Sequence, residues 1–313
     1  MSTNSILEPV AISPHRIDPR TLPGFIYLKV LSLEQQIAFY RQVVGLQLNW
    51  RKEKSAGMGI GGRDLVRMTE IKDGRRYRRV TGMYHFAIRF PSRRELARVI
   101  ARLYSLGWTN YPTDHIMTKT TYLDDPEGNN IELYAESPED GVNVVSNGQF
   151  YVRRADGSIS EGREALDLNA LFAHLQQDDA LNTPVPEETR MGHFHLYVAD
   201  LQATRHFYHE LLGFDDMGVA YNFRMGMVSA GGYHHHIGYN TWQGEGAPPP
   251  PPDALGLKLF TFNLPDEEEL ERMEGLLQEQ GVAYERQPVG LLLHDPSQNP
   301  LLLTTAGLSA ESI

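Results

Sequence analysis

The sequence predicts an α+β protein built from four modules, each of which has a strand, a helix and several further strands. The first observation is an internal repeat, in which GFIYLKVLSLEQQIAFYRQVVGL from Gly24 aligns with GHFHLYVADLQATRHFYHELLGF from Gly192. The second is the order within each copy, where an alternating run typical of a strand leads into a helical pattern that ends at a glycine. The third is the run Pro248–Pro252, which suits neither a sheet nor a helix and predicts a stiff spacer.

A second, weaker repeat completes the set of modules. HFAIRFPSRRELARVIARLYSLGW from His85 resembles LFTFNLPDEEELERMEGLLQEQGV from Leu259, and both continue through an Asp-Pro turn into a late strand. We therefore expect modules at residues 22–80, 82–136, 190–243 and 255–305. The domains that we expect are an N-terminal arm (1–20), a domain with modules one and two (22–136), a connector with a hairpin and a helix (137–189) and a domain with modules three and four (190–308).

The composition limits the kinds of site that this chain can build. It has no cysteine and twelve histidines, so a metal site has to use imidazole and carboxylate ligands. The 29 basic and 40 acidic residues give a net charge of −11, which argues against nucleic-acid binding. No apolar run approaches the roughly 20 residues of a membrane span, and the N-terminus lacks the pattern of a secretory signal. We expect a cytoplasmic protein with no membrane partner.

Particular motifs resemble those of the vicinal oxygen chelate superfamily. They are Phe-Tyr and a glycine after the first helix of a module, and an Asp-Pro-x-Gly-Asn turn before a strand that carries a glutamate. The stretches GMYHFAIRFPSRRELAR, DHIMTKTTYLDDPEGNNIELY and SAGGYHHHIGYNTWQGEGAPPPPP are similar to bacterial catechol-2,3-dioxygenases. The resemblance covers most of the chain outside the arm and the connector. It implies the fold shared by glyoxalase I, fosfomycin-resistance proteins and type I extradiol dioxygenases, in which four βαβββ modules form two paired half-barrels.

The resemblance implies a metal site made by His85, Glu132 and His193. The superfamily places its ligands on the first and last strands of paired modules, and these three residues occupy such positions in modules two and three. His195 shares the strand face of His193 and stays an alternative to it. Two imidazoles and one carboxylate with open positions suit Fe(II), with Mn(II) and Zn(II) as alternatives.

Modules one and four lack the usual ligands. Module one has Phe25 at the position of His193, and module four has Leu259 and Leu302 at the matching places. We therefore expect modules two and three to pair around one metal, and modules one and four to pair around a vacant site.

The resemblance implies three further groups close to the metal. Tyr122 stands where extradiol dioxygenases carry a tyrosine that hydrogen-bonds the catecholate, and His115 resembles the histidine that precedes that strand. The triplet His234–His236 falls where these enzymes place an acid–base histidine. Strand alternation sets His235 on the opposite face from its two neighbours. The apolar residue that follows His236 favours His236 as the inward group, with His235 second.

The activity that the resemblance implies is extradiol (meta) ring cleavage. Fe(II) and O2 would open a small aromatic diol, a catechol or a hydroquinone, while His236 handles a proton and Tyr122 and His115 orient the diol. Proteins of this kind often self-associate, so a homo-oligomer is expected. Two other functions stay open. One is a glyoxalase-like metal-dependent isomerase or transferase, and the other is a metal-free protein that binds an aromatic ligand.

Overall fold

The computed structural model describes residues 10–305, and each module contains a strand, a helix and three more strands. Module one comprises β1 (Leu22–Val30), α1 (Leu33–Phe39), the π-helical turn η1 (Tyr40–Val44), β2 (Gln47–Arg51), β3 (Ser55–Ile60) and β4 (Arg63–Glu70). Module two comprises β5 (Gly82–Phe90), α2 (Arg93–Ser105), β6 (Tyr111–Asp114), β7 (Thr118–Asp124) and β8 (Asn130–Glu136). Module three comprises β13 (Arg190–Tyr197), α4 (Leu201–Arg205), η2 (His206–Leu211), β14 (Asp215–Ala220), β15 (Met225–Ser229) and β16 (Ile237–Asn240). Module four comprises β17 (Gly256–Leu264), α5 (Glu267–Glu279), β18 (Tyr284–Gln287), β19 (Gly290–His294) and β20 (Pro300–Thr305). The four βαβββ modules predicted from the repeats are confirmed.

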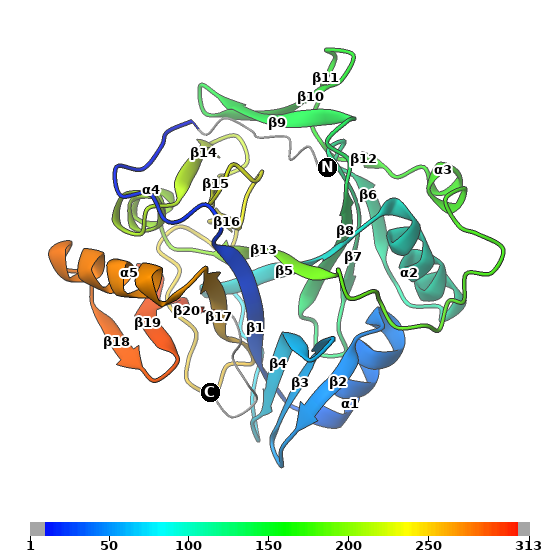
Figure 1. Cartoon of the computed structure of the whole chain (residues 1–313), viewed down its shortest axis with the longest axis horizontal. Coiled ribbons are helices and arrows are strands. Elements are labelled where there is room, and N and C mark those ends of the chain that lie inside the picture. Colours follow the sequence, from blue (N-terminus) through cyan, green and yellow to red (C-terminus); the bar gives the residue numbers. More distant parts are fainter. Residues whose placement is uncertain (1–9, 306–313) are drawn as a thin grey trace.

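Each of the two large sheets joins modules that are not neighbours along the chain (Figure 1). β5 pairs antiparallel with β13 at the centre of a nine-stranded sheet of order β12-β6-β7-β8-β5-β13-β16-β15-β14, which joins modules two and three and is completed by β12 (Glu164–Ala165). β1 pairs antiparallel with β17 in an eight-stranded sheet of order β18-β19-β20-β17-β1-β4-β3-β2, which joins modules one and four. The predicted pairing of modules is therefore confirmed. The division into two domains at the connector stays a prediction, because each large sheet takes strands from both sides of it.

The helix of every module begins at a short polar residue two or three positions after the end of the first strand. Ser32, Ser92, Asp200 and Asp266 each accept a hydrogen bond from the backbone N–H three residues later. Such an N-cap satisfies a donor that the helix cannot satisfy internally and contributes about 1 kcal/mol. The repeated sequence therefore starts each helix at the same place relative to its sheet.

The Phe-Tyr and Asp-Pro motifs of the repeats contact each other in the fold. Tyr40 at the end of the first helix donates its hydroxyl to the carboxylate of Asp125 in module two. Tyr208 does the same to Asp295 in module four. Each of these carboxylates also accepts from the backbone of its own turn. These motifs hold consecutive modules together, which explains their repetition without a catalytic role.

Alternation along β13 separates the core from the site. Phe194 packs between the two sheets, with its ring 5.1 Å from Phe260 and 5.9 Å from Phe262 on β17. Its neighbours His193 and His195 point to the other face, because successive strand side chains alternate. The apolar contact that joins the sheets therefore also sets the direction of the histidines.

The connector covers the open end of the nine-stranded sheet (Figure 1). It contains β9 (Gly141–Ser146), β10 (Gln149–Arg154) and β11 (Ile159–Ser160) in a three-stranded sheet, then β12 and α3 (Leu168–Phe172). β12 pairs antiparallel with β6, so the connector is attached to module two. Within residues 10–305, no helix combines the length and the apolar composition needed to cross a membrane.

Candidate metal centre

Three neighbouring strands bring His85, Glu132 and His193 together. β5 carries His85, and β8, which is parallel to it, places Glu132 beside Ala87. β13 runs antiparallel to β5 on the other side and places His193 beside the same Ala87. The two partners of Ala87 therefore approach His85 from opposite edges of its strand. Among residues 10–305 this is the single group of three that could hold a metal ion.

The donor atoms of these side chains form a nearly equilateral triangle. His85 Nε2 lies 3.2 Å from His193 Nε2 and 3.3 Å from Glu132 Oε2, and His193 Nε2 lies 3.2 Å from Glu132 Oε2. Ligands at about 2.1 Å from one ion lie about 3.0 Å apart at right angles and about 3.4 Å apart in a tetrahedron. The observed spacing falls between these values, so the three residues fit one metal ion.

Electrostatics favour the protonation states that bind a metal. Burial lowers the pKa of His85 to about 3, so its imidazole is neutral. Burial alone would raise the pKa of Glu132, but a hydrogen bond from His193 and the charges of His193 and His85 hold it well below its usual range. The three side chains are between 2% and 4% exposed. A buried carboxylate between two imidazoles is costly unless a cation compensates it, and a metal ion supplies that charge.

Ring packing orients the two histidines. The Nδ1 atoms of His85 and His193 are buried and have no hydrogen-bond partner among the residues that the structure describes. The His85 ring lies 5.6 Å from the Tyr122 ring, and the His193 ring lies 5.5 Å from the Tyr134 ring. Metal-binding histidines usually donate from their second nitrogen to a carboxylate or carbonyl, so this pair is unusual in depending on aromatic neighbours.

His195 lies next to the triangle without joining it. Its Nε2 is 2.9 Å from the side-chain amide of Asn240, and its ring lies 5.0 Å from that of His85. The structure therefore brings His193 rather than His195 to the candidate ligand position, and His195 becomes part of the wall.

Tyr122 and His115 form a hydrogen-bonded pair beside the triangle. Tyr122 on β7 is the register partner of Glu132 on β8, and its hydroxyl lies 2.9 Å from His115 Nε2. The other ring nitrogen of His115 contacts the carbonyl of Gly162 in the connector. Burial and the Glu132 charge raise the pKa of Tyr122 well above its usual range. Tyr122 and His115, which the sequence predicted to lie close to the metal, thus line the same pocket as the metal triangle.

His236 does not line this pocket, which corrects the choice made from the sequence. Its Nδ1 accepts a hydrogen bond from the Ala230 amide at 3.1 Å and lies 3.2 Å from Ser229 Oγ. Its ring points toward Phe262 in the core. The physical reason is that β16 begins only at Ile237, so the histidine triplet lies on the preceding turn and does not alternate as a strand does.

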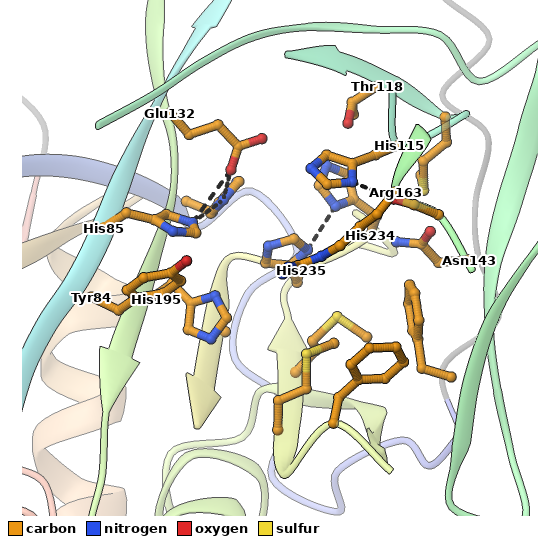
Figure 2. A pocket seen from close by; sticks show the side chains of 18 of the residues that line it. Tyr84, His85, His115, Thr118, Glu132, Asn143, Arg163, His195, His234 and His235 are labelled. Atoms are coloured by element: carbon orange, nitrogen blue, oxygen red, sulfur yellow. Dashed lines mark hydrogen bonds and ion pairs between the residues drawn. The ribbon is translucent and has the colours of Figure 1, made fainter. Parts of the chain in front are cut away.

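His234 and His235 do face the pocket (Figure 2). Their Nδ1 atoms lie 2.7 Å apart, and the His235 ring is 4.2 Å from that of His193. Burial, with the charge of His193, lowers the pKa of both well below the usual range for histidine. The sequence pattern favours His236 and then His235 as the inward residue. Of the histidines His234–His236, His235 is therefore the one whose ring lies closest to the metal triangle.

The connector contributes a wall that the repeats could not reveal. Asn143, Phe150, Glu161, Gly162 and Arg163 all line the pocket. Module three adds further lining side chains, which are mainly apolar: Phe223, Met225, Met227 and Trp242. No repeat aligns with the connector. The sequence pattern therefore gave no indication that connector residues line the pocket.

The other half of the molecule has replaced the metal ligands. Phe25, Tyr27, Leu259 and Leu302 form an apolar cluster between modules one and four. Arg67 on β4 is the register partner of Tyr27, as Glu132 is of Ala87, so a guanidinium replaces the carboxylate. That modules one and four hold no metal stays a prediction, which these apolar side chains favour.

The fold and the triangle of two imidazoles and one carboxylate define a candidate mononuclear metal protein. Residues 25–133 and 190–290 match the family described as the Glyoxalase/Bleomycin resistance protein/Dioxygenase superfamily. The chain belongs to this superfamily. It is 35% identical over 276 residues to a catechol-2,3-dioxygenase of Bacillus subtilis (strain 168), in an alignment that covers 87% of this chain and 93% of the relative.

Solved structures show the same fold at low sequence identity. A candidate dioxygenase from Bacillus subtilis subsp. subtilis str. 168 superposes with a TM-score of 0.61 at 12% identity, covering 94% of this chain and 87% of its own. Glyoxalase I from Zea mays superposes with a TM-score of 0.54 at 16% identity, covering 91% of this chain and 92% of its own. These two likenesses concern the fold alone.

Proposed function

We propose that this chain is an extradiol dioxygenase that inserts O2 into a catechol-type diol at one Fe(II) held by His85, His193 and Glu132. The observation that carries the proposal is the buried triangle of donors, which lines a pocket with aromatic and methionine side chains. Two imidazoles and one carboxylate leave coordination positions for a bidentate diol and for O2. The 35% identical catechol-2,3-dioxygenase supports this class of reaction.

Fe(II), when bound, would act as a Lewis acid toward the diol and as the centre that activates O2. The protein shapes the pocket and excludes water from it. Phe150, Phe223 and Trp242 offer flat apolar faces for an aromatic ring, and Met225 and Met227 add flexible apolar surface to the same pocket. Their apolar surfaces exclude water and thereby strengthen the electrostatic interactions of the buried triangle.

Tyr122 positions the diol through a fixed hydrogen-bond direction. The Gly162 carbonyl can only accept, so His115 Nδ1 carries the proton in the contact between them. In a neutral ring His115 Nε2 then accepts from the Tyr122 hydroxyl. The lone pairs of the Tyr122 oxygen stay available to accept a hydrogen bond from a diol hydroxyl.

We assign the acid–base role to His235 in place of His236. His236 Nδ1 is occupied by the Ala230 amide in the core, whereas His235 lines the pocket next to His193. A neutral imidazole at that place can accept a proton from the diol as it binds and return it during ring opening. His234 contacts His235 Nδ1 and orients its ring.

Oxygen uptake tests this function directly. Protein reconstituted with Fe(II) without oxygen is mixed with a panel of catechols and hydroquinones, and O2 consumption is followed together with the yellow ring-cleavage product. We expect uptake with at least one diol, its loss in His85→Ala, and its retention in His206→Ala, which changes an exposed histidine. Product formation by His85→Ala at the wild-type rate would refute the assignment of the centre.

The same samples separate the two other functions that the sequence left open. Protein loaded with Mn(II) or Zn(II) is assayed in parallel. Isomerase activity with Zn(II) in the absence of oxygen would favour a glyoxalase-like enzyme. Failure to retain any metal, together with tight binding of a diol, would favour a metal-free binding protein.

A further inference from the structure

The connector carries a positive charge into a pocket that is otherwise mostly apolar. Arg163 is the single lysine or arginine among the residues that line this pocket, all of which lie in the described part of the chain. Its side chain is exposed and makes no hydrogen bond or ion pair with any of residues 10–305. An unpaired guanidinium in a binding cavity is a ready partner for a carboxylate, because its planar donors can bind both oxygens.

The backbone around Arg163 is held in place on both sides. The carbonyl of Gly162, directly before it, contacts the ring of His115, which in turn contacts Tyr122. Directly after it, Glu164 pairs with β6 as part of β12, and its carboxylate binds Arg154. The start of the Arg163 side chain is thus fixed relative to the metal triangle, while its charged end is free to meet a ligand.

Arg163 lines the same pocket as the three residues of the metal triangle. A ligand that fills this pocket can therefore contact both the triangle and the connector. In the view of Figure 2, Arg163 and Asn143 are labelled on the side of the pocket opposite His85.

We propose that Arg163 binds an anionic substituent on the substrate ring, so that the preferred substrates are diols that carry a carboxylate. This rests on the proposed function, which places the two diol oxygens at the metal triangle. The ring then lies between the apolar walls, and its far substituent meets the connector. Asn143 of β9 lines the same pocket and offers a second hydrogen-bond donor. Glu161 also lines it, and its negative charge opposes anion binding there.

Binding measured without oxygen tests the proposal apart from turnover. Titration calorimetry compares 3,4-dihydroxybenzoate with its uncharged analogue 3,4-dihydroxybenzamide, using both metal-free protein and protein loaded with Zn(II). We expect the wild type to prefer the acid by about tenfold, the lower end for a charge-assisted hydrogen bond. Arg163→Gln should remove this preference and leave the affinity for the amide unchanged. Arg163→Glu should weaken binding of the acid further. This variant should instead bind a diol that carries a positively charged aminomethyl group more tightly than the wild type does.

Two further variants control for general effects. Arg153→Gln removes an exposed arginine of β10 that does not line the pocket and should leave the preference unchanged. Glu161→Gln should increase the preference for the acid. An equal preference in wild type and Arg163→Gln would overturn the proposal, as would a lack of binding of both ligands to both forms. If the preference follows Arg163 but no diol supports oxygen uptake, the anion site stands and the proposed reaction fails.

Discussion

His236 offers a test of the distinction between core and pocket histidines, because its burial makes the stability of the protein depend on pH. Burial, with the charges of Arg89 and His193, lowers the pKa of His236 to about 3. Its Nδ1 accepts from the Ala230 amide, so a proton there would break that bond. Since the folded pKa lies below the unfolded value, the unfolded state binds more protons, and stability is lost as the pH falls below about 6.5. Between about pH 7.5 and about pH 5 the loss from His236 amounts to about 2 kcal/mol.

The assay is urea unfolding of metal-free protein at these two pH values, for wild type and His236→Asn. Asparagine keeps an acceptor for the Ala230 amide but cannot take up a proton. We expect the free energy of unfolding of the variant to fall by about 2 kcal/mol less than that of the wild type over this range. His206→Asn, at an exposed histidine, should behave as the wild type does. Equal pH dependence in wild type and His236→Asn would show that His236 is not a neutral core residue.

Three other substitutions probe the centre and its surroundings. Glu132→Gln keeps the shape of the side chain but removes its charge, so metal affinity should fall by more than about 100-fold in an equilibrium dialysis assay; unchanged affinity would contradict its role as a ligand. His115→Ala should leave metal binding intact, lower kcat/KM by about tenfold and speed hydrogen exchange at Gly162, because the contact between connector and Tyr122 is lost. Equal exchange would argue against that contact. Asp64→Asn removes the negative charge that lies 2.7 Å from the buried Arg67 Nε, and the loss of this buried ion pair should cost about 3 kcal/mol in thermal unfolding; a change in metal affinity instead would mean that the two halves are coupled.

The sequence predicted the modules and the triangle because the fold repeats. Residues at equivalent positions of repeated strands occupy equivalent places on a sheet, so His85 and His193 could be recognised together and Glu132 added to them. The same comparison identified Phe25 and Leu259 as replacements in the half without ligands. The candidate ligands lie in modules two and three, which predicted that these two modules pair with each other. The order of strands in the sheets confirms that pairing.

Features outside the repeats could not be predicted. The direction of His236 depends on a turn whose two glycines, Gly231 and Gly232, have positive φ angles of 66° and 73°, and periodicity carries no information about such a turn. The wall made by the connector depends on the pairing of β12 with β6, about fifty residues apart in sequence. The position of Arg163 follows from that long-range pairing, which a local pattern does not encode.

We propose that modules two and three hold one metal ion and that modules one and four hold none. The decisive measurement is the amount of iron bound per chain after anaerobic loading with Fe(II) and removal of the excess. We predict about one Fe(II) per chain in the wild type and in His195→Ala, and almost none in His85→Ala or His193→Ala. Iron retained by His85→Ala and His193→Ala at the wild-type level, or about two ions per wild-type chain, would contradict a single metal site in modules two and three.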